Sequence, residues 1–309
     1  LLLATLAFLL WGHPSLVGLP CAALLFIAPA NAERPSAGPS LPLAGAIGML
    51  SIVLLMLTVL SGGRLAAVMS TYIVLVTAAF ASLVLLRQEA LLKRALRSML
   101  FGGLATALLI QIVWGTEGWG AISWEVTREA SNTMRWLVEV SPPRGMAVMY
   151  SLFEPMVRFV SLTWPGMLAL QTLAGLALAW QLHLRLTSLP LGAPIARFRD
   201  FAIGDAWVWG IVAWIIVLIL PVSSALHIAG TNVGLVAGAL YVLRGAAIVL
   251  TFAEAFGISS AALLIVAAAA AGLAVPLIFV LPGLCTLGIT DTWYQYRRRL
   301  AEAQHNLRK

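Results

Sequence analysis

The chain has 309 residues, of which 61% are hydrophobic and only 10% are charged, and its formal net charge is +7. With a mean hydropathy of +0.98, this composition excludes an ordinary soluble globular protein and predicts an integral membrane protein. A nucleic-acid-binding protein is also disfavoured, because Lys and Arg are spread over short loops and the tail instead of forming one patch.

Apolar runs mark the predicted membrane helices, because a bilayer core about 30 Å thick needs roughly 20 apolar helical residues. Helices are expected since backbone groups in lipid must be paired within their own segment, and the runs do not alternate as barrel strands would. The predicted fold is therefore an all-α, polytopic transmembrane bundle of seven to nine helices. In chain order the runs are residues 1–11 (or the end of a longer run), 15–30, 43–60, 65–86, 99–114, 162–182, 206–220, 228–252 and 258–289.

The segment 16–32 ends in Ala30-Asn31-Ala32, which resembles a signal-peptide cleavage site. The stretch before it lacks the positive charge of a signal peptide, so we expect an uncleaved helix. Cys21 and Cys285 both fall inside apolar runs and have no partner at metal-ligand spacing. We expect both to be packing residues, with no zinc site and no disulfide framework.

Two basic breaks, residues 87–97 and 185–205, interrupt the runs and are separated by two crossings. The positive-inside rule places both breaks, and the basic tail 297–309, in the cytoplasm. Three runs between the second break and the tail would leave the tail outside. Either one of these runs does not span the membrane, or one of the basic breaks lies on the unexpected side. We favour the first alternative, with an incompletely spanning or broken segment near residues 221–230. The predicted parts are N-terminal membrane helices (1–114), an insert (115–161), C-terminal membrane helices (162–296) and the tail.

The insert at residues 115–161 should be extracytoplasmic, and its charges show no positive excess. We predict a helix at 121–140, a stop at Pro142-Pro143 and a second short helix at 146–160. Two interpretations stay open. The insert lies as amphipathic helices in the headgroup layer, or it is a lid or a partner-docking surface. Both depend on its clustered tryptophans, Trp114, Trp119, Trp124 and Trp136.

Arg244 is the strongest pointer to function, because a charge within a membrane helix is costly and an arginine cannot lose its proton. Asp205 and Glu254 are candidate partners, and snorkelling to the headgroups is the alternative. Asn232 lies twelve positions earlier, about 120° around the helix, so the two do not form a site unaided. A small-residue track on the same helix predicts close packing, or else a substrate path; it consists of Gly230, Gly234 and Gly238.

The last apolar run closes with LGITDTWYQYRRRL, residues 287–300. Rings and cations at a helix end are typical of a water boundary, so we expect this stretch to anchor the helix at an anionic surface. The predicted anchors are Trp293, Tyr294, Tyr296, Arg297, Arg298 and Arg299. His183 and Arg185 are interpreted as an interfacial pair. No ligand spacing among the four histidines and no catalytic motif is found, so neither an enzyme nor a metal or other cofactor is expected.

The C-terminal third, residues 197–300, resembles the YybS-like family of predicted bacterial membrane proteins. That family has an Asn-containing helix that reaches a Leu-Tyr-x-Leu-Gln-Gly-like segment, and a final helix ending in a Leu-Gly-x-x-Asp, aromatic, Arg-rich signature. The first pattern is matched by Asn232, Leu240, Tyr241 and Gly245, and the second by Leu287, Gly288, Asp291, Tyr296, Arg297 and Arg299. Arg244 departs from it, since the family pattern leads us to expect Gln there.

The resemblance implies a multi-pass protein of the bacterial cytoplasmic membrane. It also implies distant kinship with the S-components of energy-coupling-factor transporters, although none of their ligand residues can be carried over. Two hypotheses follow. The first is a non-enzymatic, small-solute-binding or transporter-like subunit, with Arg244, Asn232 and Tyr241 lining the recess. The second is a scaffold of a larger membrane complex that uses the small-residue faces and the Trp-rich insert.

Overall fold

The computed structural model describes residues 13–30, 40–86, 89–140, 143–187, 190–259, 262, 265 and 277–307. Helices supply the regular structure in these ranges, and no strand occurs in them, which confirms the all-α prediction. The chain divides into two compact units, Leu1–Ile195 and Ala196–Lys309.

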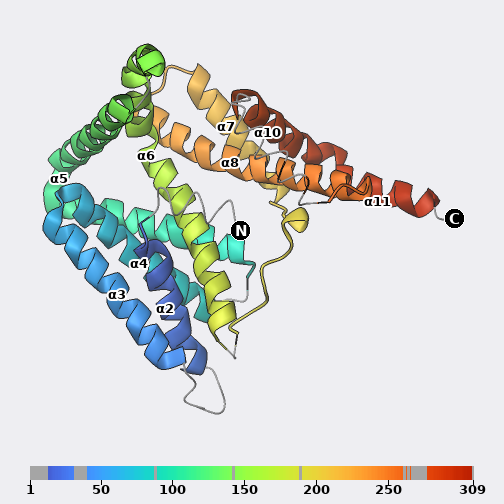
Figure 1. Ribbon diagram of the computed structural model, residues 1–309, viewed down its shortest axis with the longest axis horizontal. Helices are drawn as coiled ribbons and strands as arrows, with labels where there is room; N and C mark the ends of the chain where they lie inside the picture. Colours follow the sequence, from blue (N-terminus) through green and yellow to red (C-terminus); the bar gives the residue numbers. More distant parts are fainter. Residues whose placement is uncertain are drawn as a thin grey trace. The chain divides into compact units, whose positions relative to one another are not determined.

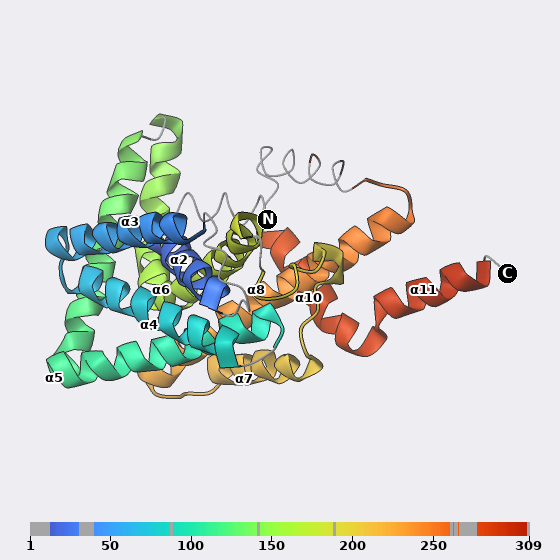
Figure 2. The same cartoon turned by 90° about the horizontal axis from the view of Figure 1, so that it is seen from below.

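The described residues of the N-terminal unit form five helices (Figure 1). Three coincide closely with predicted runs, while the predicted runs 99–114 and 162–182 lie inside two much longer helices. The core is formed where α4 packs along the first half of α5 and where α2 packs against the second half of α6 (Figure 2). The bounds are α2 Ser15–Ala30, α3 Ser40–Ser61, α4 Arg64–Leu86, α5 Leu91–Val140 and α6 Pro143–Leu186.

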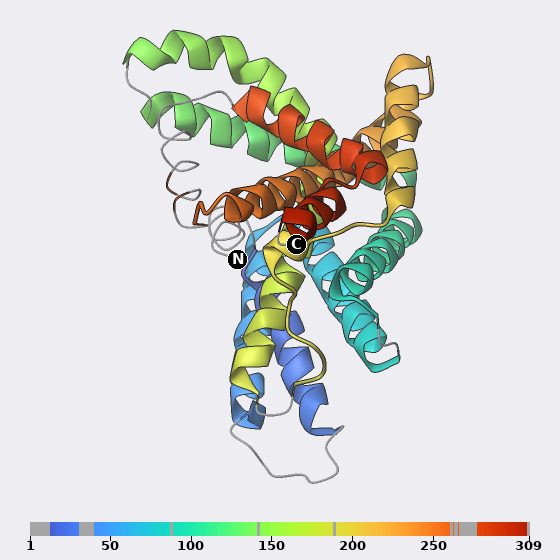
Figure 3. The ribbon, with the colours of Figure 1, turned by 90° about the vertical axis from the view of Figure 1, so that its right-hand side faces the viewer.

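The predicted insert is a helical hairpin. Helix α5 breaks at Gly115, whose φ of 61° and ψ of −154° are accessible only to glycine. The remainder of α5 runs beside the first half of α6 (Figure 3), with Met134 and Val157 in their shared core. The predicted end of the second helix at residue 160 is wrong, because α6 continues through Pro165 to Leu186. Of the predicted stop at Pro142-Pro143, Pro142 lies outside the described residues.

The hairpin also supplies a cap for another helix of the same unit. The first two backbone N–H groups of α4, those of Arg64 and Leu65, donate to the two carboxylate oxygens of Glu125 at 3.1 and 2.7 Å. These amides have no partner inside α4, and the carboxylate also complements the positive end of the helix dipole. Gly63 lies against the same carboxylate, where a Cβ would come within 2.8 Å of its oxygens.

Glu125→Ala should therefore lower the free energy of unfolding by about 1–2 kcal/mol, the usual effect of losing a helix cap. Titration of the detergent-solubilised protein with sodium dodecyl sulfate, followed by circular dichroism, measures this change. Glu129→Ala is the matched control, because Glu129 lies one turn further along α5 and is exposed. Equal losses in the two variants would refute the capping role.

The C-terminal unit contains α7 Val208–Ile219, α8 Ser224–Ala255, α10 Leu277–Tyr294 and α11 Tyr296–Leu307. Two single 3₁₀ turns, Phe198–Asp200 and Asp205–Trp207, precede α7. Helix α7 has 12 residues and reaches only about 18 Å at 1.5 Å per residue, too short for a bilayer core. Helix α7 ends just before residues 221–230, where we predicted an incompletely spanning or broken segment; the side of the membrane on which the tail lies stays a prediction. Of the predicted run 258–289, residues 260–261, 263–264 and 266–276 lie outside the described residues, and its last part belongs to α10.

Five described helices are long and apolar enough to cross a membrane, and α2 and α7 are shorter apolar helices. The five segments are Pro42–Leu60, Arg64–Leu86, Leu91–Val140, Tyr150–Leu186 and Ser224–Ala255. Large apolar side chains are exposed along them, such as Met49, Leu108 and Ile112. Such a surface is expected where helices meet lipid instead of water.

Candidate functional site

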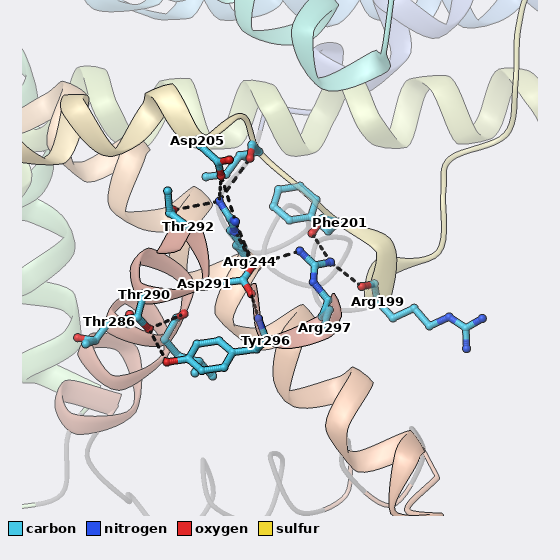
Figure 4. A network of polar contacts seen from close by, with 12 residues as sticks. Arg199, Phe201, Asp205, Arg244, Thr286, Thr290, Asp291, Thr292, Tyr296 and Arg297 are labelled. Carbon is cyan, nitrogen blue, oxygen red and sulfur yellow. Dashed lines mark hydrogen bonds and ion pairs between the residues drawn. The ribbon is translucent and has the colours of Figure 1, made fainter. Parts of the chain in front are cut away.

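Arg244, on α8, is the centre of a buried polar network in the C-terminal unit (Figure 4). Its side chain is 7% exposed, and both its Nε and Nη2 lie 3.0 Å from Oδ2 of Asp291 on α10. Its Nη1 lies 3.2 Å from Oδ1 of Asp205 and 3.4 Å from the carbonyl oxygen of Ile203, both in the segment before α7. One guanidinium group therefore joins two helices and a loop, which suits its planar fork of donors.

Asp291 is the second centre of the network. Its side chain is only 4% exposed, and its two oxygens have different partners. Oδ2 faces Arg244 and also lies 3.6 Å from Nη2 of Arg297, whereas Oδ1 accepts the backbone N–H of Tyr296 at 3.0 Å. That N–H belongs to the first turn of α11, which follows Gln295 in a left-handed conformation with a φ of 47°. Asp291 thus fixes the junction between α10 and α11.

The three consecutive arginines have three different environments. Arg297 donates to the carbonyl oxygens of Arg199 and Phe201 at 3.0 and 3.1 Å, so it holds the loop before α7 instead of facing outward as the anchor prediction required. Arg298 is exposed and pairs with Glu302 one turn along α11. Arg299 lies over the ring of Tyr294, 5.7 Å from its centroid.

The predicted ring anchors also differ from one another. Trp293 and Tyr294 are exposed, with 64% and 52% of their surfaces accessible. Tyr296 is half-buried, and its hydroxyl lies 3.4 Å from Thr290 Oγ1 on α10. Only the first two rings therefore have the outward position expected of residues at a membrane surface.

A small recess opens beside the network. It has a volume of about 190 Å³ and is lined by Arg244, Arg297 and Arg298, by Asp205 and Asp291, and by Thr292 and Gln295. Three guanidinium groups against two carboxylates give it one net positive charge. The recess is smaller than a drug-sized pocket of 300–1,000 Å³. It can hold a small polar solute or the charged end of a larger one.

The other two residues predicted to bind a ligand are not among those that line this recess. Asn232 is buried, and its amide donates to the carbonyl oxygen of Ile228 one turn earlier in α8. Tyr241 is fully buried. Of the two partners predicted for Arg244, Asp205 contacts it, whereas Glu254 instead lies 2.8 Å from Arg199.

The predicted glycine track is in contact with α7 over part of its length. A Cβ on Gly230 would come within 2.7 Å of Val217, and one on Gly234 would overlap Trp214. Gly238 differs from the prediction, because nothing among the described residues lies within 4 Å of such a Cβ. The closest approach of α8 and α10 uses Gly245 and Gly288, where added Cβ atoms would overlap the carbonyl oxygens of Leu284 and Tyr241.

The sequence offered a signal for Asp291 that the prediction did not use. It is the only acid in residues 258–301, and a carboxylate at the end of a membrane run needs a cation just as Arg244 needs an anion. Arg297 offered no such signal beside two identical neighbours. Among the described residues no three His, Cys, Asp or Glu side chains come close enough to hold a metal ion.

One protein-family model matches most of the chain. The model of a family described as a predicted membrane protein (DUF2232) matches residues 42–292. The chain belongs to this family. The DUF2232 match includes α4, α5, α6 and α8 together with Asp205, Arg244 and Asp291, so it covers much more than the resemblance over residues 197–300. No curated protein and no solved structure matches the chain.

Proposed function

We propose that this DUF2232 protein is a non-enzymatic, transporter-like subunit of a bacterial cytoplasmic membrane that binds a small solute in the recess beside Arg244. The observation that carries the proposal is the charge of this recess, with three arginines and two aspartates around about 190 Å³. Ionisable side chains that face the interior of a membrane-helix bundle often mark substrate or ion pathways.

The free hydrogen-bonding capacity of the recess indicates the class of solute. Arg244 and Asp291 largely satisfy each other, whereas the side chains of Asp205 and Arg298 remain 65% and 74% exposed. An accessible carboxylate and an accessible guanidinium group suit a small zwitterion, or an anion with a second polar group. Neither Asn232 nor Tyr241 is needed for this form of the proposal.

Arg298 provides the sharpest test, because it lines the recess without contacting Arg244 or Asp291. Small molecules that co-purify with the detergent-solubilised full chain should be identified by mass spectrometry for the unaltered protein, Arg298→Gln and Arg299→Gln. The adjacent Arg299 does not line the recess and is the matched control. We expect Arg298→Gln to reduce the recovered solute about tenfold, as for loss of one charge-assisted hydrogen bond. Equal recovery from both variants, or no solute at all, would contradict the proposal.

A scaffold function has its own structural support in the hairpin of α5 and α6. Trp124 and Trp136 are exposed there, with 62% and 59% of their surfaces accessible. Exposed tryptophans are typical of headgroup contacts and of protein interfaces. The same purification distinguishes the two functions: a stoichiometric polypeptide that disappears in Trp136→Ala, without any bound solute, would favour the scaffold.

A further inference from the structure

Arg94 is a buried cation in the N-terminal unit, near the beginning of α5. The residue is 7% exposed, and its guanidinium group lies over the ring of Trp180 on α6, 5.6 Å from the centroid. Its Nε is buried and has no hydrogen-bond partner, and no carboxylate in the described ranges pairs with it. The ring face supplies one favourable contact, but it leaves the Nε–H donor unfilled.

The nearest acid in the sequence is already engaged by another residue. Glu89 is the only carboxylate between residues 65 and 116. Both of its oxygens accept from Nη1 of Arg97, three positions beyond Arg94. The pairing of Arg97 thus leaves Arg94 as the buried cation of this stretch, while Lys93 beside it is exposed.

A second unfilled donor lies beside the same tryptophan. His183 is fully buried within the protein, and its ring centroid is 6.0 Å from that of Trp180. Its Nε2 accepts the backbone N–H of Leu191 at 3.4 Å, so the proton of the neutral ring is assigned to Nδ1. Nδ1 is buried and has no partner among the described residues.

The cost of this arrangement indicates a missing anion. A buried guanidinium group cannot lose its charge by deprotonation, and an unpaired buried charge is strongly unfavourable unless another group compensates it. A pure packing role would be fulfilled better by an apolar side chain of the same size. Two unfilled donors around Trp180, one of them charged, are what an oxyanion requires.

We propose that Arg94 and His183 bind a phosphate group beside Trp180. The position fits such a group, because α4 ends at Leu86, α5 begins at Leu91 and α6 ends at Leu186, so the site lies at the ends of apolar helices, where headgroups are found. The indole ring is held in place by a hydrogen bond from its Nε1 to the carbonyl oxygen of Ala193 at 3.2 Å. The group comes from a phospholipid or from free phosphate, and the site is independent of the recess beside Arg244.

The test uses the delipidated full chain in detergent and measures its melting temperature with phosphatidylglycerol, phosphatidylcholine or inorganic phosphate added. Phosphatidylglycerol or inorganic phosphate should stabilise the unaltered protein and Lys93→Gln, the matched loss of one exposed charge. Arg94→Gln should weaken the apparent affinity about tenfold or more, the effect of one charged hydrogen bond. A response to phosphatidylglycerol alone assigns a lipid headgroup, and a response to inorganic phosphate assigns a free anion.

Two further variants separate binding from folding. Without any ligand, Arg94→Gln should melt at the same temperature as the unaltered protein or higher, because it removes an unpaired buried charge. His183→Phe keeps a ring beside Trp180 and should weaken binding about threefold or more, as for a neutral hydrogen bond. The proposal is overturned if neither phosphate source stabilises the unaltered protein, if Arg94→Gln responds equally, or if Arg94→Gln alone is strongly destabilised without ligand.

Discussion

Asp291→Ala is expected to lower the free energy of unfolding of the C-terminal unit by about 3–5 kcal/mol, the range for removing one partner of a buried ion pair. The variant leaves Arg244, only 7% exposed, without its principal carboxylate, and Asp205 is too exposed to replace it fully. It also removes the acceptor for the backbone N–H of Tyr296 and so loosens the junction of α10 and α11. Titration of the solubilised protein with sodium dodecyl sulfate measures this loss.

A double-mutant cycle shows whether the loss belongs to the pair. Arg244→Gln should cost less than Asp291→Ala, because Asp291 keeps Arg297 and the N–H of Tyr296. The double variant should lose less than the sum of the two single losses, since no buried charge is then left alone. Glu254→Gln is the control, because the side chains of Arg199 and Glu254 are 40% and 34% exposed and loss of this pair should change stability by less than about 1 kcal/mol. Additive losses would exclude the pairing.

The helices could be predicted from the sequence because they depend on the local run of apolar residues. Long apolar runs must be helical in lipid whatever they pack against, so residues 15–30, 43–60 and 65–86 were located within a few positions of α2, α3 and α4. The sequence also predicted that Arg244 needs a partner, because the cost of a buried charge depends on the residue type alone. Neither argument needs knowledge of which helices are neighbours.

The partners themselves depend on tertiary contacts. Asp291 lies 47 positions from Arg244, and nothing in the sequence marks it as a better partner than Asp205 or Glu254. In the sequence, nothing distinguishes Arg297, Arg298 and Arg299. They acquire different environments only in the structure, where α11 begins. There the left-handed Gln295 turns the chain so that Arg297 faces the loop before α7. Only such backbone geometry distinguishes the contacts of one arginine in the cluster from those of its identical neighbours.

Glycine positions show the same limit. Gly238 and Gly245 lie seven positions apart on α8, nearly the same face of a helix, and their neighbours are alike in composition. In the structure only Gly245 lies against α10, where the helix passes the backbone of Leu284, whereas Gly238 has no described atom within 4 Å of an added Cβ. The spacing of residues in one helix therefore does not predict where a second helix crosses it.

Gly245→Ala is therefore expected to be the most damaging of the small substitutions on α8, with a loss of about 3 kcal/mol in the free energy of unfolding, near the upper end for overpacking. The added methyl group would overlap the carbonyl oxygen of Leu284. Because that atom belongs to the backbone, α8 and α10 must move apart, and the contact between Gly288 and Tyr241 opens with them.

Gly238→Ala is the matched control, since it makes the same chemical change in the same helix. It should be neutral or stabilising by about 0.5–1 kcal/mol, because alanine favours a helix interior over glycine. Unfolding of both variants in mixed micelles, followed by the fluorescence of the tryptophans, compares them directly. A similar change in stability for the two variants would mean that α8 and α10 do not approach each other at Gly245. Because Arg244 is adjacent to Gly245, its pairing with Asp291 could then not be as close as described. Opposite responses would place the helix crossing beside the buried ion pair, so that tight backbone packing and charge pairing stabilise the same contact.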